Sequence, residues 1–504
     1  MGDTSGQITD RAISYGRRLG DLARERPADA GLVFVERAGG EQTLTWSELE
    51  ARSNRVARLL EERGVSQGAW LVVGLPNSPE HIVSTLAGWK LGACVLPVSA
   101  RLPAAERDGL LDLAAPTLVV SVWDDLDWPN LARTGLESAD ALSDETLPDR
   151  IPHPGKAVGS GGSTGRSKII IDPRPWAAEP GDTFKGLGGG VGMAPGRDVL
   201  IPGPLYHNAP YCWTHWSLFE GLKVVVMEKF DAELALDLIE RHRVGWAQLV
   251  PTTMQRMLRV PDVERRDLSS LQAIMHTAAP CPPWVKRGWI ELIGAEKILE
   301  AFGATEAIGA TIIRGDEWLE REGSVGRPAG CVLRILDDEG RELPCGEVGE
   351  IYMRLESGEA PAYEYRGAPP APATADGFVT VGDMGWLDED GYLFLADRRT
   401  DLIITGGANV YPHEVEAVIG EHPGVADVAV IGLQDREWGK RVHAVLSATD
   451  PADPPSAAEL DLFCRDRLVS YKVPKSYEVL IDFPRDEAGK IRRSALAAER
   501  RETT

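Results

Sequence analysis

Helical and extended patterns alternate along the first half of this chain. Residues 44–64 carry apolar side chains at helical spacing, begin at an expected Ser47 cap followed by Glu50, and stop at Gly64. The apolar positions of this face are Leu49, Val56, Leu59 and Leu60. The next segment, WLVVGLPNS, is a short β-branched run that ends in turn residues, and STLAGWKLGACVLPV repeats the change from helix to strand. Alternation of this kind predicts an α/β sheet.

The length of 504 residues exceeds one ordinary core, so we expect at least two domains. The strand-to-helix pattern recurs at LKVVVMEKF and WAQLVPTTMQRMLRV, whereas residues 325–395 are short strands separated by DDEG, GEVGE and DEDG turns. The composition shifts again near residue 400, and the rest of the chain is long enough for a small domain. We predict an α/β fold: a large N-terminal domain at residues 1–399, made of α/β subdomains and a small β-rich subdomain, and a small C-terminal α+β domain at residues 400–504.

The composition excludes several classes of protein. A formal net charge of −23 argues against nucleic-acid binding, because the overall field would repel a phosphate backbone. Six scattered cysteines without a CxxC pair indicate neither a disulfide framework nor a zinc site. No apolar run reaches the roughly 18 residues needed to span a membrane, and the N-terminal residues lack the apolar run of a signal peptide. We expect a cytoplasmic monomer or homodimer.

Residues 159–168, GSGGSTGRSK, combine glycines with hydroxyl side chains. Glycines allow successive backbone N–H groups to turn toward one anion, and serine and threonine hydroxyls add donors, so the stretch is typical of a phosphate-binding loop. A flexible linker has a similar composition, but KIIID follows at once and joins the loop to a strand. The stretch is not a Walker loop, because its lysine does not directly follow the last glycine. It is not a dinucleotide-binding motif either, because a strand follows it where that motif requires a helix.

Five segments in order resemble the motifs of the acyl-adenylate-forming enzymes, a superfamily that includes acyl-CoA synthetases, luciferases and peptide-synthetase adenylation domains. The segments are residues 160–168, residues 302–306 (FGATE), residues 381–383 (VGD), residues 398–407 with their glycine pair, and residues 484–496 (PRDEAGKIRRSAL). They extend over most of the chain. The nearest subfamily in pattern is that of the bacterial bile-acid and fatty-acid CoA ligases, and coronafacate ligase is a further relative.

The resemblance implies that ATP is bound through its phosphates and a magnesium ion. In this family the acid attacks the α-phosphorus and pyrophosphate leaves, so cations and aligned donors matter more than a base. The loop residues Ser163, Thr164 and Gly165, with Lys168, would hold the β- and γ-phosphates. Thr305 would contact the α-phosphate. Glu306 would bind Mg²⁺, which prefers one or two carboxylates together with phosphate oxygens.

The same resemblance implies which residues bind the nucleoside and which lysine the mobile domain carries. Asp383 and Arg398 would hold the ribose, and Phe302 would enclose the adenine together with the turn at Ala279. Lys490 would bridge the carboxylate and the α-phosphate during adenylation, carried there by a mobile C-terminal domain.

Two positions depart from the family pattern. Ser167 stands where a proline is usual, and Thr400 stands at the hinge where aspartate or lysine is more common.

For the acceptor, Gly406 and Gly407 resemble residues that line a channel for the pantetheine arm of coenzyme A. Trp438, in DREWG, resembles an aromatic side chain that packs beside that arm. A core tryptophan after a strand is the alternative for Trp438. Coenzyme A is therefore the first choice of acceptor, and an amino acid that forms an amide, as in coronafacate ligase, is the second.

For the acid, His207 in PLYHNAP matches an aromatic or histidine gate between nucleotide and acyl pocket, with a core histidine as the alternative. Aromatic residues downstream favour a bulky cyclic or aromatic acid over a linear chain. The predicted pocket residues are Tyr211, Trp213, Trp216, Gln248, Gly303 and Ile308. The alternative from a different functional class is a binding protein that has the adenylate-forming fold but no catalytic activity.

Overall fold

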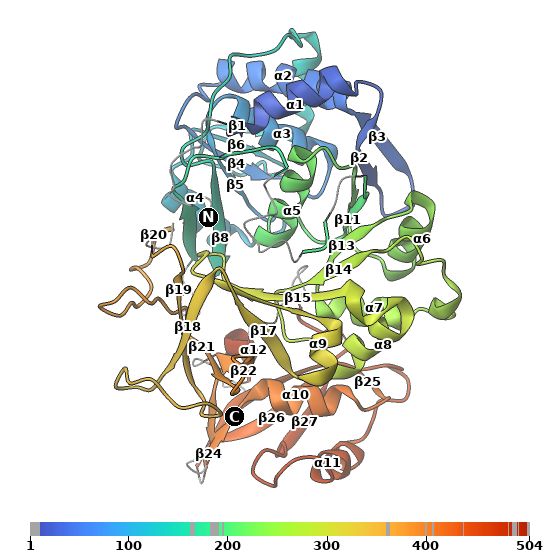
Figure 1. The fold of residues 1–504 in the computed structure, drawn as a ribbon, viewed down its shortest axis with the longest axis vertical. Helices are drawn as coiled ribbons and strands as arrows, with labels where there is room; N and C mark the ends of the chain where they lie inside the picture. Colours follow the sequence, from blue (N-terminus) through green and yellow to red (C-terminus); the bar gives the residue numbers. More distant parts are fainter. Residues whose placement is uncertain are drawn as a thin grey trace.

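The computed structural model describes residues 11–161, 167–181, 191–193, 196–358, 363–398, 401–405, 408–436, 438–481, 483–485, 491 and 493–500. Within these ranges two large sheets and a smaller C-terminal sheet organise the chain, as Figure 1 shows. This arrangement confirms the predicted α/β class with a large N-terminal part and a smaller C-terminal part. The boundary near residue 400 stays a prediction.

The first large sheet holds the phosphate-loop strand. Its strands in spatial order are β20 (Glu364–Arg366), β9 (Ser167–Asp172), β8 (Lys156–Gly161), β5 (Cys94–Pro97), β4 (Trp70–Gly74), β6 (Leu118–Ser121) and β7 (Asn130–Ala132). The strands from β8 to β7 run parallel, whereas β9 and β20 are antiparallel to their neighbours. The helices that precede or follow these strands are α2 (Trp46–Glu62), α3 (Pro79–Lys90) and α4 (Ala104–Ala114). The predicted alternation of helix and strand is confirmed here.

The second large sheet continues from a parallel half into an antiparallel half. The parallel half, with one antiparallel edge strand, is β3 (Glu41–Thr45), β2 (Ala30–Val35), β12 (Val224–Met227), β11 (Val199–Ile201), β13 (Trp246–Leu249), β14 (Ala273–His276) and β15 (Ile298–Gly303). The antiparallel half is β16 (Ala310–Arg314), β17 (Ser324–Ala329), β22 (Leu393–Arg398), β21 (Asp383–Leu387), β19 (Gly349–Leu355) and β18 (Cys331–Leu336). The antiparallel half contains most of the β-rich unit predicted over residues 325–395, whereas β20 of that range joins the first sheet.

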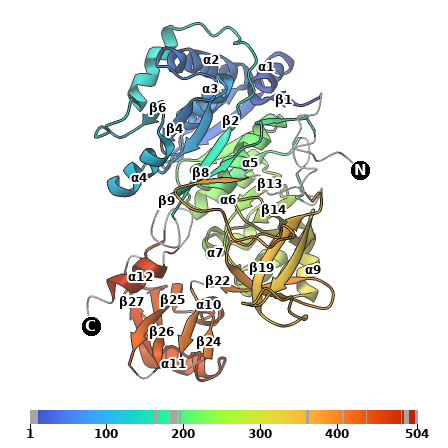
Figure 2. The ribbon, with the colours of Figure 1, turned by 90° about the vertical axis from the view of Figure 1, so that its left-hand side faces the viewer.

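Helices cover the second sheet, and Figure 2 shows their arrangement from the side. They are α5 (Asn208–Phe219), α6 (Ala232–His242), α7 (Pro251–Leu258), α8 (Pro283–Ile293) and α9 (Gly315–Glu320). The remaining N-terminal elements are β1 (Ile13–Ser14), α1 (Tyr15–Glu25), β10 (Ala177–Ala178) and the 3₁₀ turns η1 (Arg133–Ala141), η3 (Val263–Arg265) and η4 (Ala295–Lys297).

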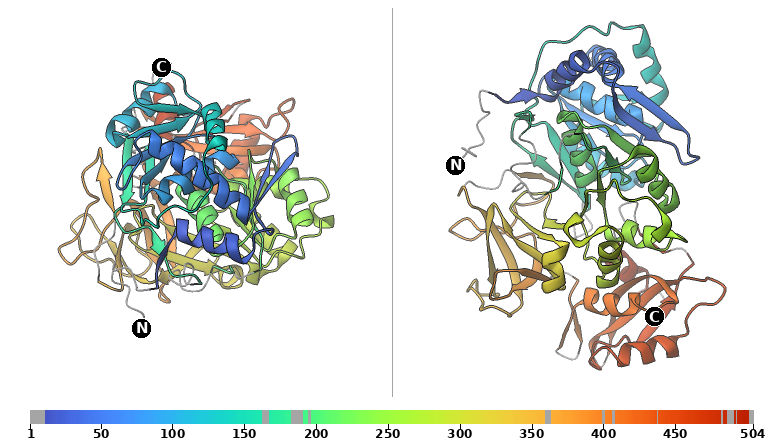
Figure 3. Two further views of the ribbon diagram at one scale, coloured as in Figure 1. Left: turned by 90° about the horizontal axis from the view of Figure 1, so that it is seen from above. Right: turned by 45° about the vertical axis from the view of Figure 1, so that its right-hand side comes forward.

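The C-terminal part has its own sheet and core. Its elements are β23 (Ile403–Thr405), β24 (Ala408–Val410), α10 (Pro412–Gly420), β25 (Val425–Asp435), β26 (Gly439–Ala448), α11 (Ala457–Arg465), β27 (Ser476–Val479) and α12 (Arg493–Glu499). One buried apolar cluster here draws its buried members only from residues between 403 and 473. Figure 3 shows this part as a separate body at the end of the molecule away from α1 and α2.

The start of helix α2 differs from the prediction. Thr45 is the cap: its Oγ1 accepts a hydrogen bond from the Glu48 N–H at 3.2 Å, and the Glu48 carboxylate accepts one from the Thr45 N–H at 2.8 Å. Both Thr45 with Glu48 and Ser47 with Glu50 match the capping-box spacing. Glu50 is instead buried, where its carboxylate accepts a hydrogen bond from the Lys90 ammonium at 2.5 Å, and this tertiary contact decides between the two.

In the part of the chain that the structure describes, no helix is both long enough and apolar enough to cross a membrane. All six cysteines are free thiols in the structure.

Candidate active site

A pocket lies where strand β15 ends and strand β21 begins. The residues that line it are Phe302, Gly303, Ala304, Ile308, Ile351, Met353, Val381 and Asp383. After β15 the chain turns sharply: Ala307 has a left-handed φ of 51°, and its N–H donates to the Ala304 carbonyl at 3.0 Å before β16 returns antiparallel. This turn holds Thr305 and Glu306. The FGATE segment therefore forms one wall of a pocket, with the β-rich unit opposite.

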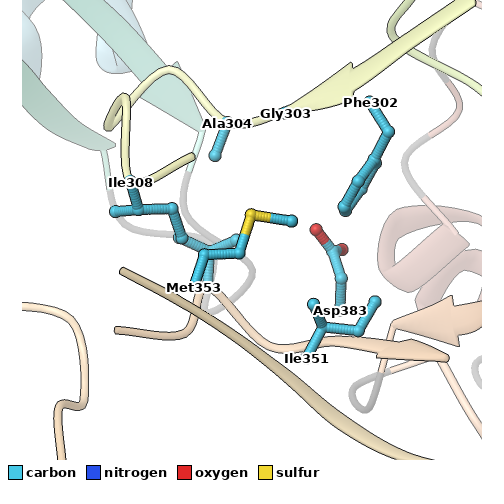
Figure 4. Close-up of a pocket in the computed structure, with 8 residues that line it drawn as sticks. Phe302, Gly303, Ala304, Ile308, Ile351, Met353 and Asp383 are labelled. Atoms are coloured by element: carbon cyan, nitrogen blue, oxygen red, sulfur yellow. The ribbon is translucent and has the colours of Figure 1, made fainter. Parts of the chain in front are cut away.

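Phe302 and Asp383 point toward one another across this pocket (Figure 4). Asp383 opens β21, and the antiparallel register places it opposite Arg398, the last residue of β22. The Gly382 N–H donates to the Thr380 hydroxyl at 3.0 Å, and Gly382 itself has a φ of 87°, which favours glycine and shapes the turn before Asp383. The fold thus brings together the residues predicted for adenine and ribose. The Arg398 side chain lies outside the described residues.

The turn at Ala279 lies at the same edge of the sheet as Phe302. Strands β14 and β15 are parallel and pair His276 with Glu300, so the segment after His276 and the segment after Glu300 leave the sheet side by side. Ala279 is exposed there. This placement suits the predicted enclosure of a planar base between Phe302 and the turn.

Glu306 is held by two donors from the first large sheet. The Lys168 ammonium lies 3.2 Å from its Oε1 in an ion pair, and the Tyr365 hydroxyl also donates to Oε1. The Lys168 ammonium lies 3.9 Å from the centre of the Tyr365 ring, at cation–π distance. Burial, and then the hydrogen bond to Glu306, raise the pKa of Tyr365 well above its usual value, so the phenol keeps its proton and donates.

These groups fit a magnesium ion held partly by a nucleotide. Mg²⁺ takes one or two carboxylates and completes its shell with phosphate oxygens and water. Among the described residues, no group of three or more His, Cys, Asp or Glu side chains could hold a metal ion. Glu306, 5% exposed, supplies one carboxylate beside a lysine suited to phosphate. The donor set therefore suits an ion that arrives with its phosphates.

The residues predicted for the acid divide between two places. Gly303 and Ile308 line the same pocket as Phe302 and Asp383. Tyr211 is fully buried in the core between α5 and α3, with its ring centroid 5.9 Å from that of Trp89. The acid-binding role of Tyr211 stays a prediction.

Trp213 of α5 lies toward β13. Trp213 packs against Trp216 and Trp246, with ring centroids at 5.2 Å and 4.9 Å. Gln248 is buried on the same strand as Trp246, and its side-chain amide donates to the Leu249 carbonyl at 3.0 Å. His207 occupies the N-cap position of α5 without a side-chain capping hydrogen bond, and its ring centroid lies 4.4 Å from that of Tyr206. The roles predicted for these residues stay predictions.

Trp438 is 44% exposed in the turn between β25 and β26, which contradicts the alternative of a core tryptophan. Its N–H donates to the Asp435 carboxylate at 3.0 Å. Gly439, the next residue, pairs with Thr405. This register brings Trp438 close to Thr405, the last described residue before the glycine pair in the sequence.

Several predicted positions lie outside the described residues, and their roles stay predictions. They are Ser163, Thr164, Gly165, Thr400, Gly406, Gly407 and Lys490. Conversely, Tyr365 joins the site without having been predicted. It lies far from Glu306 in the sequence, and its segment, YEYRG, shows no motif that would have identified it.

Comparisons with known proteins agree on one family. A sequence model described as AMP-binding enzyme matches residues 21–360, and one described as AMP-binding enzyme C-terminal domain matches residues 414–490. The fatty acid–acyl-carrier-protein ligase ScoC of Streptomyces coeruleorubidus is 31% identical over 483 residues, which cover 90% of this chain and 91% of that protein. A feruloyl-CoA synthase of an Amycolatopsis species is 32% identical over 469 residues, which cover 90% of this chain and 93% of that protein.

A solved structure has the same fold over nearly the whole chain. It is the o-succinylbenzoate CoA synthetase of Bacillus subtilis in complex with its acyl-adenylate intermediate. It is 26% identical, covers 97% of this chain and 98% of its own, and superposes with a TM-score of 0.80.

Proposed function

The chain belongs to the AMP-binding enzyme family, and from that premise we propose that it is an ATP-dependent ligase that activates a cyclic or aromatic carboxylic acid as its acyl-adenylate and transfers the acyl group to coenzyme A. The observation that carries this proposal is the pocket in which Phe302 faces Asp383, next to the Glu306 carboxylate with its Lys168 partner. An aromatic face, a hydrogen-bond acceptor and a cation beside a carboxylate are the groups that a magnesium-bound nucleotide requires.

In the first step an oxygen of the substrate carboxylate forms a bond to the α-phosphorus of ATP, and the bond from that phosphorus to the bridging oxygen breaks as pyrophosphate leaves. Both reactants are anions, so donors positioned in advance supply most of the stabilisation. Lys168 would contact the outer phosphates, Thr305 the α-phosphate, and Lys490 the oxygens on both sides of the new bond. Mg²⁺ bound at Glu306 would neutralise part of the triphosphate charge.

In the second step the thiol of coenzyme A loses its proton to solvent, its sulfur bonds to the acyl carbon, and AMP leaves with the electron pair of the broken carbon–oxygen bond. The exposure of Trp438, and the pairing of its neighbour Gly439 with Thr405, support a thin thiol arm on this side of the C-terminal part. The feruloyl-CoA and o-succinylbenzoate-CoA enzymes among the relatives support both the acceptor and an aromatic acid. Transfer to an amino acid is the second candidate, kept because the acyl-adenylate is common to both reactions.

The cytoplasm is the proposed location. Six unpaired cysteines, four of them buried, are typical of a reducing compartment.

Two measurements test the function. ATP–pyrophosphate exchange with a panel of cyclic and aromatic acids should show exchange with at least one acid. Mass spectrometry of the products formed with coenzyme A, and separately with each amino acid, should then show a thioester. If no acid supports exchange while a known ligase is active in the same assay, the proposed activity is wrong and the chain is a catalytically silent protein with the adenylate fold. An amide product would replace coenzyme A with an amino acid as the acceptor.

A further inference from the structure

The Tyr365 hydroxyl makes a contact that crosses from one sheet to the other. Tyr365 lies in β20, at the edge of the first large sheet, whereas Glu306 follows β15 of the second sheet. The phenol donates to the Oε1 atom of Glu306, the same oxygen that the Lys168 ammonium approaches to 3.2 Å. One carboxylate oxygen therefore receives both donors.

Tyr365 is itself held in place from two directions. Its strand pairs antiparallel with β9 and sets Tyr365 opposite Ile170, two residues after Lys168. The next residue, Arg366, places its guanidinium 4.0 Å from the ring centre of Trp70 and donates to the Ala114 carbonyl at 3.3 Å. The pairing with β9 and the Arg366 contacts restrain the backbone on either side of the tyrosine, so the hydroxyl meets Glu306 from a fixed position.

The second carboxylate oxygen, Oε2, is in a different situation. Both donors that Glu306 has within the described ranges reach Oε1 and not Oε2, although the Glu306 side chain is only 7% exposed. A buried carboxylate usually satisfies its oxygens with several donors, because removing the charge from water is costly. A carboxylate anchored through one oxygen and open at the other is suited to bind a cation through the open oxygen alone.

We propose that Tyr365 is a positioning residue, which anchors Oε1 of Glu306 so that Oε2 is presented to the magnesium–nucleotide complex. This inference rests on the proposed function, because it takes Glu306 as the ligand of the metal. Tyr365 touches neither substrate nor metal, and it acts through the orientation of Glu306. The ring adds a second effect, since it holds Lys168 beside the same carboxylate before the nucleotide arrives.

The test separates nucleotide binding with magnesium from nucleotide binding without it. The affinity for ATP is measured by calorimetry in excess Mg²⁺ and again in excess EDTA, and the ratio of the two dissociation constants gives the gain due to the metal. Tyr365→Phe removes the hydroxyl and keeps the ring. Tyr363→Phe is the matched control, because its ring lies 4.9 Å from that of Tyr365 and its hydroxyl accepts from the Ala371 N–H, whereas the Tyr365 hydroxyl donates to Glu306.

In Tyr365→Phe the gain due to Mg²⁺ should fall about tenfold, the lower end of the range for a hydrogen bond to a charged group, while the affinity in EDTA changes less than about twofold. Tyr363→Phe should keep the gain of the unmodified protein. Thermal unfolding without ligand checks that both variants are folded. Glu306→Gln should abolish most of the gain, and adding Tyr365→Phe to it should cause little further loss.

An unchanged gain in Tyr365→Phe, or an equal loss in both tyrosine variants, would overturn the inference while the proposed function stands. An unmodified protein that binds ATP equally with and without Mg²⁺ would also overturn it. If the unmodified protein binds no ATP in either buffer, the proposed function fails first and the inference fails with it.

Discussion

Lys286 and Glu300 form an ion pair that is almost entirely buried between helix α8 and strand β15, with side-chain exposures of 1% and 7%. The Lys286 ammonium also lies 4.8 Å from the ring centre of Trp318, and His276 of β14 approaches Glu300 to 4.0 Å. Glu300 is two residues before Phe302, so this pair supports the strand that carries the predicted adenine contact.

Removal of one partner should be costly. Lys286→Met leaves the Glu300 carboxylate buried without its cation, and burial already raises the pKa of that group. We expect a loss of about 3–5 kcal/mol in the free energy of unfolding, measured by urea denaturation. The exposed pair of Arg243 and Asp267 provides the control: Arg243→Ala should leave the free energy nearly unchanged. Similar small losses in both variants would contradict the argument.

Lys490→Ala should reduce ATP–pyrophosphate exchange by about a hundredfold or more, because it removes a cation positioned against charge that develops in the transition state. Binding of ATP, measured by calorimetry, should stay nearly the same, since the phosphate loop and Glu306 remain. Lys475→Ala is a control on the same part of the chain, where the ammonium donates to the Ser470 carbonyl at 3.3 Å. An exchange rate equal to that of the unmodified protein would refute the role of Lys490.

Acid should destabilise the protein through two buried histidines. Burial lowers the pKa of His81 to about 3 and that of His215 to about 4. Below pH 6.5 these two histidines bind protons in the unfolded chain but stay neutral in the native state. The free energy of unfolding therefore falls as the pH falls. Between pH 7.5 and pH 5, the free energy of unfolding of His81→Leu should fall by about 2 kcal/mol less than that of the unmodified protein.

The measurement is the free energy of unfolding at the two pH values. His81 is suited to this substitution because, within the described ranges, its ring nitrogens have no hydrogen-bond partner. His153 is exposed, and His153→Gln should follow the unmodified protein. A His81→Leu variant with the full acid loss would show that His81 does not carry this dependence.

The C-terminal part is attached to α7 through side chains that bind backbone. The Arg259 guanidinium donates to the carbonyls of Ala426 at 2.8 Å and Val425 at 3.1 Å, and the Gln255 amide donates to Ala426 at 2.9 Å. If this part rotates between the two steps, these contacts belong to one pose only. Arg259→Ala should then change the ratio of pyrophosphate exchange to thioester formation by about fivefold or more, which corresponds to about 1 kcal/mol.

The neighbouring Arg256 is exposed on the same helix and makes none of these contacts, so Arg256→Ala should leave the ratio unchanged. Both half-reactions are measured on the same preparation with the same acid. If Arg259→Ala lowers the rates of pyrophosphate exchange and thioester formation by the same factor, the variant has lost stability in general and the balance between the poses has not shifted.

Much of the architecture could be predicted from the sequence because the relevant signals are local. The periodicity of residues 44–64 and the β-branched run of WLVVGLPNS each depend on neighbours a few positions away, and both elements formed where they were expected. The order of the five motifs likewise needs no tertiary information, and it led to the family. The motifs therefore identify the residues of the FGATE segment and Asp383 as candidate site residues without any tertiary information.

Tertiary structure decided what lies next to what. Thr45 and Ser47 both satisfy the capping pattern, and only the burial of Glu50 against Lys90 selects Thr45. The packing of the Tyr211 ring against Trp89 of α3 likewise follows from the fold and not from the sequence around Tyr211. The contact of Tyr365 with Glu306 depends on how an edge strand of one sheet meets a turn of the other. Such contacts arise from strand pairing over long separations, which no short window of sequence records.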